Sequence, residues 1–439
     1  MIILKNGLCV DPVSETEKIG DIAIKDGVIC SIADRIDPSL HINRGEAVDI
    51  YDCTGLIIGP GLVDAHVHFR DPGFTHKEDI YTGAEAAIRG GVTSVIMMAN
   101  TKPAIDNVET LEYVLNKGKE TGIHVYSSAT VTKGLKGNEL TDMKALKEAG
   151  AVAFTDDGIP LLSEDIARAA MEAAVKNDTI LSFHEEDPSY ITNNGVNRGK
   201  ASEYFGIEGS DRQAEISMVE RDIRLAKETG ACINIQHIST AEAVERVRMA
   251  RREGMGDIIH AEATPHHMSM TEEDTIRYGT NAKMNPPLRT EDDRNAIIQG
   301  IVDGTIECIA TDHAPHTFEE KNVPIDKAPS GIIGLETSFS VSYNTLVKCG
   351  YLSLVQLFCK MSLNPARLYK IYAGELAIYR TADILIYDPN KIHSFDKSRS
   401  KSFNSPLAKR TITGDVVGTI SSGVMLYCDI EDRLKRVTP

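Results

Sequence analysis

The chain has 439 residues, of which 42% are hydrophobic and 25% are charged, an ordinary balance for a soluble globular protein. Its formal net charge of −17 and the lack of any basic cluster argue against nucleic acid as a partner. No apolar run approaches the ~18–20 residues that span a bilayer, and the first residues lack the charged and apolar regions of a signal peptide. We therefore expect a cytoplasmic protein that acts neither on a membrane nor on nucleic acid.

The cysteines point to the same compartment. There are eight, scattered along the chain without a CxxC pair: Cys9, Cys30, Cys53, Cys232, Cys308, Cys349, Cys359 and Cys428. In a chain of this length such cysteines are typical of small buried hydrophobic residues rather than of a disulfide framework. They fit a reducing cytoplasm.

Short strand patterns occupy the first sixty residues and return near the other end of the chain. Lys25-Asp26-Gly27 supplies turn chemistry between two of the early strands. The strands are expected at 2–4, 21–24, 28–30, 382–387, 415–420 and 424–427. We predict one small β-sandwich-like domain built from both termini, residues 1–60 and 372–439.

Between these ends, apolar strands alternate with helices. The strand-like runs are 62–67, 92–98, 123–129, 151–154, 179–183, 232–236, 258–263 and 306–310. Helices are expected at 84–89, 110–119, 163–176, 211–228 and 241–252, with Ser163 and Thr240 available as N-caps. Eight buried parallel strands alternating with helices indicate a (β/α)8 TIM barrel of class α/β over residues 61–371. A doubly wound open sheet is the alternative, but no Gly-x-Gly-x-x-Gly follows a first strand.

Candidate metal ligands follow most of these strands. His66 and His68 are two residues apart on the first barrel strand, so both side chains point to the same side. Catalytic residues of a (β/α)8 barrel come from the carboxyl ends of its strands, and six of the eight ends carry a His, an Asp or both. The residues concerned are His66, His68, Asp156, Asp157, His184, His237, His266, His267, Asp312, His313 and His316. The pattern predicts a metal site at the mouth of the barrel.

The residue types favour zinc. Imidazole and carboxylate ligands without a clustered thiol suit Zn²⁺, whereas an all-oxygen set would suit Mg²⁺ or Ca²⁺. Four histidines and two aspartates exceed the needs of one tetrahedral ion, but a pair of ions about 3.5–4 Å apart that share one carboxylate would use them all. We expect two Zn²⁺ ions per chain. Strand parity alone leaves open whether Asp156 or Asp157 bridges them.

Several sequence blocks resemble those of one family. Residues 61–73 (GLVDAHVHFRDPG) and 310–316 (ATDHAPH) resemble the two signatures of dihydroorotases, in the amidohydrolase superfamily. Further matching blocks follow in the same order at 98–103, 154–158, 264–267, 284–289 and 331–337. The resemblance covers essentially the whole chain and is to the type I bacterial enzymes.

The resemblance implies a role for each matching residue. One zinc ion would be held by His66, His68 and Asp312, and the other by His184 and His237. By motif match, Asp157 would bridge the ions; the fourth strand ends without the carboxylated lysine of many amidohydrolases, as in the type I pattern. Asp312 would also be catalytic, as the group that takes and returns a proton. The substrate would be bound by Arg70, Asn100, Asn285, His316 and Gly331.

The activity implied is the reversible cyclisation of N-carbamoyl-L-aspartate to L-dihydroorotate, the third step of de novo pyrimidine biosynthesis. The enzyme would be a hydrolase acting on carbon–nitrogen bonds in cyclic amides. Its substrate carries a carboxylate, which the planar fork of Arg70 would bind with two hydrogen bonds. The implied partners are this small molecule, a second copy in a homodimer, and aspartate carbamoyltransferase.

The sequence leaves alternative functions open. Another cyclic amidohydrolase, an allantoinase or hydantoinase, would share the barrel and the ligands but would not need Arg70. An inactive dihydroorotase-like partner of aspartate carbamoyltransferase would lose ligands, whereas this chain keeps all six. The alternative to substrate binding by Arg70 is a surface ion pair with Asp71 or Glu78.

Other positions carry weaker expectations. Ala99 and Ser330 depart from the family pattern, which has proline and a bulky apolar residue there. His266, His267 and His313 are expected to support the ligands or the core. Residues 317–330 are rich in charge and proline and are expected to form a mobile lid over the site.

Overall fold

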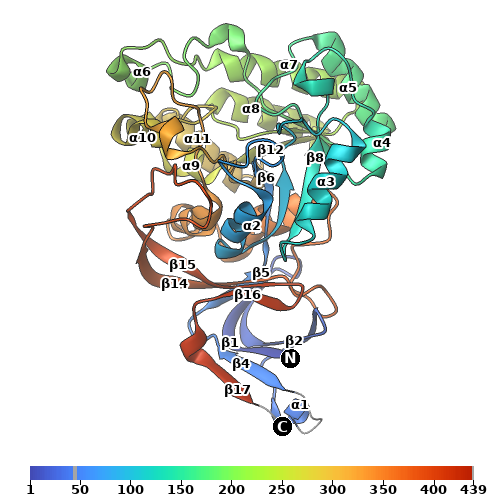
Figure 1. Ribbon diagram of the computed structural model, residues 1–439, viewed down its shortest axis with the longest axis vertical. Coiled ribbons are helices and arrows are strands. Elements are labelled where there is room, and N and C mark those ends of the chain that lie inside the picture. The colour runs from blue at the N-terminus through green and yellow to red at the C-terminus, as the bar shows by residue number, and fades with distance from the viewer. Residues whose placement is uncertain (43–46, 438–439) are drawn as a thin grey trace.

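The computed structural model describes residues 1–42 and 47–437, which form two parts stacked on each other (Figure 1). The upper part in the figure is a barrel surrounded by helices, and the lower part is a β structure that contains both ends of the chain. Among the described residues, no helix combines the length and the apolar character needed to cross a bilayer.

The barrel contains eight parallel strands in sequential order. They are β6 (Leu62–Val67), β7 (Val92–Met97), β8 (His124–Ala129), β9 (Ala153–Phe154), β10 (Leu181–Phe183), β11 (Ile233–Ile235), β12 (Ile259–Ala263) and β13 (Cys308–Ile309). The circle closes where the amide of His68 donates to the carbonyl of His313 at 2.9 Å. Each strand lies in a predicted apolar run, because parallel strands covered on both faces are hydrophobic throughout. The predicted (β/α)8 fold is confirmed.

The helices surround the strands (Figure 1). Their bounds are α2 (Ile80–Arg89), α3 (Val108–Gly118), α4 (Met143–Glu148), α5 (Glu164–Lys176), α6 (Lys200–Phe205), α7 (Gln213–Thr229), α8 (Ala241–Ala250), α9 (Pro265–Ser269), α10 (Glu272–Tyr278), α11 (Glu291–Val302), α12 (Phe318–Lys321), α13 (Ser338–Ser342), α14 (Leu354–Phe358) and α15 (Asn364–Leu368). Ser163 and Thr240 cap α5 and α8 by accepting hydrogen bonds from the amides of Ile166 and Ala243. Both predicted N-caps are therefore correct.

Strands from both ends of the chain form a second sheet. They are β1 (Ile2–Asp11), β2 (Thr16–Lys25), β3 (Val28–Ala33), β4 (Val48–Asp52), β5 (Ile57–Pro60), β14 (Ile384–Ser394), β15 (Thr411–Ser421), β16 (Val424–Cys428) and β17 (Leu434–Val437), with the short helix α1 (Ser39–Ile42) between β3 and β4. β1 pairs in parallel with β4 along its first half and with β5 further on. β5 in turn pairs with β14, so the two ends of the chain form one hydrogen-bonded unit.

The barrel and the second sheet are joined by a charged contact and an aromatic cluster. Arg89, at the end of α2, binds both carboxylate oxygens of Asp415 on β15 at 2.8 and 3.0 Å. Tyr387 on β14 is fully buried, with its ring centroid 4.8 Å from that of Phe339 and 5.3 Å from that of Tyr343. These contacts hold the sheet against the end of the barrel where its strands begin.

Candidate active site

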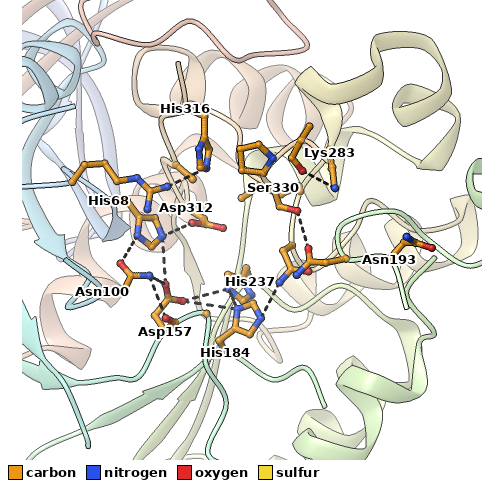
Figure 2. Close-up of a pocket in the computed structure, with 18 of the residues that line it drawn as sticks. His68, Asn100, Asp157, His184, Asn193, His237, Lys283, Asp312, His316 and Ser330 are labelled. Atoms are coloured by element: carbon orange, nitrogen blue, oxygen red, sulfur yellow. Dashed lines mark hydrogen bonds and ion pairs between the residues drawn. The ribbon is translucent and has the colours of Figure 1, made fainter. Parts of the chain in front are cut away.

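A cavity of about 570 Å³ opens where the barrel strands end. Most of the residues predicted to form a site lie in its wall (Figure 2). They are His68, Arg70, Asn100, Asp157, His184, His237, Asn285, Asp312 and His316. Two predicted residues lie just behind the wall: His66 is only 1% exposed, and Gly331 lies against His316.

The structure brings the six predicted metal ligands into one cluster. Their ligand atoms form three overlapping triads within 4.8 Å: His66–His68–Asp157, His66–His237–Asp312 and Asp157–His184–His237. Asp157 belongs to two of these triads and lies between the two pairs of histidines, as Figure 2 shows for His68, His184 and His237. Side chains from β6 and from the segments after β9, β10, β11 and β13 therefore meet at one point.

The spacing of the ligand atoms fits bound cations. Nε2 of His66 lies 3.4 Å from Oδ1 of Asp157 and 3.5 Å from Oδ1 of Asp312. Nε2 of His68 lies 3.5 Å from Oδ2 of Asp157 and 3.0 Å from Asp312. Neighbouring ligands of a tetrahedral ion with bonds of about 2.0–2.1 Å are separated by about 3.4 Å. The donor atoms are thus arranged as ligands around an ion.

The second nitrogen of most of these histidines is held by a polar partner. Nδ1 of His66 lies 2.8 Å from Glu262, Nδ1 of His68 lies 3.0 Å from Asn100, and Nε2 of His184 lies 3.2 Å from Glu186. Since each of these oxygens accepts a hydrogen bond, the nitrogen that faces the cluster is left with its lone pair. Nε2 of His66 is buried and makes no hydrogen bond among the described residues. This is the arrangement that a metal-binding histidine requires.

The charge balance of the cluster also favours a bound cation. Burial alone would lower the pKa of His66, but the carboxylates of Asp312 and Asp157 raise it well above its ordinary value. Burial would raise the pKa of Asp157, but His66 and the neighbouring histidines hold it well below its usual range. Neither carboxylate forms an ion pair with lysine or arginine among the described residues. A buried carboxylate pair of this kind needs positive charge, which the surrounding histidines supply when protonated and a bound cation would supply in their place.

Asp156 and Asp157 are distinguished by their partners. The carboxylate of Asp156 points away from the cluster and accepts hydrogen bonds from the amides of Val131 and Thr132, at 2.8 and 3.0 Å. Oδ2 of Asp157 accepts one from Nδ2 of Asn100 at 2.9 Å. Of the two aspartates that strand parity left open, Asp157 is the one whose carboxylate belongs to the ligand triads of the described residues.

Arg70 lies beside His316 at one end of the cavity. Its Nε donates to the carbonyl of Pro315 at 3.3 Å, and Nη2 lies 3.4 Å from Nε2 of His316. Burial and the charge of Arg70 lower the pKa of His316 to about 2, so its ring is neutral. Asp71 pairs with Lys117 at 2.6 Å instead. The alternative of an ion pair between Arg70 and Asp71 is therefore wrong, and no such pair with Glu78 occurs among the described contacts.

The segment 317–330 covers part of the cavity. Two buried lysines hold it through backbone carbonyls: Lys283 binds those of Ile325 and Ala328, both at 2.7 Å, and Lys321 binds that of Pro329 at 2.9 Å. Burial lowers the pKa of Lys283 to about 8 and that of Lys321 to about 7. These lysines were not singled out in the sequence, because their partners are main-chain atoms.

The unusual residue Ser330 has a defined partner. Its hydroxyl donates to Oδ1 of Asn194 at 2.8 Å and so links two loops across the cavity (Figure 2). Asn193 and Asn194 line the same wall, in a loop that no sequence motif had singled out. A bulky apolar residue at position 330 would lack this hydrogen bond.

The remaining strand-end histidines lie outside the cluster. Nε2 of His267 lies 3.0 Å from the carbonyl of Pro286, and burial lowers its pKa to about 4. Nε2 of His313 lies 3.4 Å from Glu78, while its Nδ1 accepts from the amide of Gly334 at 3.2 Å. His266 is buried beside His267, with ring centroids 4.6 Å apart. These three residues pack around the site rather than into its cavity.

Three residues of the site have left-handed backbones that are rare for residues other than glycine. The φ angles are 59° at Arg70, 32° at His237 and 48° at Asp312. Such conformations cost about 1–3 kcal/mol each and persist where the surrounding structure imposes them. Their occurrence at three cavity residues supports a functional role for this region.

Comparison with known proteins agrees with these observations. A family model described as "Dihydro-orotase-like" matches residues 55–243. A protein named "Dihydroorotase" from Clostridioides difficile is 49% identical over 427 residues, which cover 97% of this chain and 100% of that protein. Another of the same name from Streptococcus pneumoniae is 49% identical over 429 residues, with coverage of 97% and 100%.

A solved structure agrees in fold. An L-hydantoinase (dihydropyrimidinase) from Arthrobacter aurescens superimposes with a TM-score of 0.86 at 24% identity, and the match covers 98% of this chain and 96% of that one. This likeness supports the barrel with its additional β structure. The family follows from the full-length relatives: the chain belongs to the dihydroorotase family.

Proposed function

We propose that this protein is a zinc-dependent dihydroorotase, which interconverts N-carbamoyl-L-aspartate and L-dihydroorotate in pyrimidine biosynthesis. The reaction hydrolyses, or in reverse forms, a carbon–nitrogen bond in a cyclic amide. The observation that carries the proposal is the meeting of four histidines and two aspartates at one cavity whose wall also contains Arg70. The full-length relatives named "Dihydroorotase" support the choice of substrate.

The proposed cofactor is a pair of Zn²⁺ ions. His66, His68 and Asp312 would hold one ion, His184 and His237 the other, and Asp157 would bridge them. When bound, zinc polarises the ring carbonyl and makes water acidic enough to act as a nucleophile at neutral pH. Glu262, Asn100 and Glu186 keep the histidine ligands in the required tautomer.

Asp312 is proposed to move the proton. In ring opening, its carboxylate would accept the proton of the attacking water and deliver it to the departing amide nitrogen, and ring closure would reverse both transfers. The carboxylate is well placed for this task because it lines the cavity and is 4% exposed. Although burial opposes ionisation, His66 and His68 lower the pKa of Asp312, so it begins the reaction as a base.

The proposed substrate contacts line the same cavity as the ligand cluster or lie directly behind its wall. Nη1 of Arg70 makes no hydrogen bond among the described residues, and the cavity lies in front of the guanidinium. Arg70, Asn100 and His316 would bind the substrate, with the Arg70 guanidinium on its carboxylate. Asn285 and the backbone at Gly331 would contact the ring.

Two measurements test the proposal together. Purified protein is expected to contain two zinc ions per chain and to open L-dihydroorotate, followed by its absorbance. Arg70→Met should lose at least about a hundredfold in kcat/KM, because it removes a buried charged hydrogen-bond donor, while retaining both ions. A protein that opens hydantoin or dihydrouracil but not dihydroorotate, or an Arg70→Met variant with full activity, would refute the substrate assignment.

A further inference from the structure

One segment of the second sheet reaches the mouth of the barrel. Residues 395–410, here called the strap, connect β14 to β15 and rise toward α9 in Figure 1. The two ends of the strap are joined, because the amide of Phe395 donates to the carbonyl of Arg410 at 3.0 Å. Its middle is buried, with Ser402 and Asn404 each 3% exposed. The strap therefore packs into the protein.

Asn404 uses its whole side chain to join two segments of the cavity wall. Nδ2 donates to the carbonyls of Ala314 at 3.0 Å and Gly331 at 2.9 Å. Oδ1 accepts from the amide of His316 at 3.0 Å. The carbonyl of Asn404 also accepts from the amide of Ile333 at 3.0 Å. No other residue type offers two donors and an acceptor in this shape.

The two segments held in this way carry proposed substrate contacts. His316 and Gly331 are in close contact, since a Cβ on Gly331 would lie 2.7 Å from Cδ2 of the His316 ring. Ala314 and Asp312 are on the same stretch of chain. By fixing the backbone at 314, 316 and 331, Asn404 sets where the His316 ring lies relative to Arg70.

The strap has other anchors, so Asn404 is not needed to hold it in place. The amide of Lys401 donates to the buried carboxylate of Glu78 at 3.2 Å, and the hydroxyl of Ser400 also binds Glu78. The hydroxyl of Ser402 donates to the carbonyl of Lys77 at 2.8 Å. Neither Glu78 nor Lys77 lines the cavity, whereas Ala314 and His316, which Asn404 binds, do.

We propose that Asn404 is a positioning residue for substrate binding, through which the second sheet completes a pocket that the barrel leaves unfinished. Asn404 acts through the backbones of His316 and Gly331 and not by touching the substrate. This inference rests on the proposed function, because that function makes His316 and Gly331 substrate contacts. It predicts a defect in binding rather than in the chemical step.

The test compares Asn404→Ala with Ser402→Ala, a matched change of an equally buried strap residue. Asn404→Ala should raise KM for dihydroorotate at least about tenfold, since three buried hydrogen bonds are lost, with kcat changed less than about threefold and zinc content unchanged. Ser402→Ala should leave KM within about twofold. Equal KM values in the two variants, or loss of zinc in Asn404→Ala, would overturn the proposal.

A second variant and a second measurement test the proposal even if Asn404→Ala folds poorly or enzyme activity cannot be measured. Asn404→Asp keeps the shape and the acceptor for His316 but sets an oxygen against two carbonyls, so it should raise KM at least as much. Amide hydrogen exchange should become faster near 316 and 333 in both Asn404 variants, but not in Ser402→Ala. If the wild type does not open dihydroorotate, the proposed function fails, and exchange rates still decide whether Asn404 fixes these segments.

Discussion

Oε1 of Glu262 lies 2.8 Å from Nδ1 of His66, although the two residues are 196 positions apart in sequence. Both side chains are buried, and the other carboxylate oxygen of Glu262 accepts a hydrogen bond from Asn234 at 3.0 Å. Glu262 is thereby fixed in place, and it fixes the ring of His66.

Replacement of Glu262 by glutamine is expected to weaken metal binding. The variant keeps the shape of the side chain but removes the charge that orients His66, and changes of such supporting groups typically cost about 10–100-fold in metal affinity. Competition with a chelator, followed by metal analysis, measures the effect. Glu245→Gln, on the exposed face of α8, is the control. Equal affinities in the two variants would show that Glu262 does not support the metal.

Gly331→Ala should impair substrate binding. Gly331 has a φ of 155°, and an added Cβ would meet the carbonyl of Ala314 at 2.6 Å and the ring of His316 at 2.7 Å. Backbone strain of about 1–3 kcal/mol, relieved by displacing His316, should raise KM at least about tenfold. Gly206→Ala is a suitable control, because its φ is 67° but no atom lies within 4 Å of the added Cβ. A normal KM in Gly331→Ala would contradict the expectation.

His260 should make stability depend on pH. Its Nδ1 binds the carboxylate of Glu307, and although burial opposes the charged form, Cys232 and Glu307 raise its pKa from 6.5 to about 9. Because the pKa is higher in the folded state, the stabilisation is complete below pH 6.5 and is lost as the pH rises through about 9. The Tm of the wild type should exceed that of His260→Gln at pH 6, and the difference should shrink toward pH 10. A difference in Tm that does not change with pH would contradict this expectation.

Tyr387 should contribute strongly to stability where the two parts of the molecule meet. Its ring is fully buried against Phe339 and Tyr343. Tyr387→Ala is expected to lower the free energy of unfolding by about 3–5 kcal/mol, as measured by urea denaturation. Tyr379→Ala, at a position 84% exposed, should change it by less than about 0.5 kcal/mol. If Tyr387→Ala lowered the free energy of unfolding as little as Tyr379→Ala, the aromatic cluster would not couple the two parts.

The barrel could be predicted because its strands are strongly hydrophobic and regularly spaced. β6 and β12 match their predicted runs within one residue at each end. The sequence analysis missed β4, β5 and β17. β5 follows β4 after only a short turn, and β17 reads Leu-Lys-Arg-Val, which has no apolar pattern. These strands depend on partners elsewhere in the chain, such as Tyr51 opposite Leu434, which no local pattern reveals.

The candidate site was predicted in part. His66 lies on β6 and His68 directly follows it, and Asp157 and Asp312 also follow strands, so position within the barrel was enough to bring them together. Glu262 and Asn404 were missed because their partners are far away in sequence or are main-chain atoms. A single acidic residue within the apolar run 258–263 was the one available sign of Glu262.

The pairing of β5 with β14 has a consequence for synthesis. Pro60 on β5 lies opposite Ile384 on β14. Because these two residues are far apart in sequence, β5 leaves the ribosome long before the strand that covers its edge is translated. Until then the nascent chain presents unpaired backbone groups, which favour aggregation. Chains terminated before β14 should therefore be insoluble, even when all of the barrel has been translated.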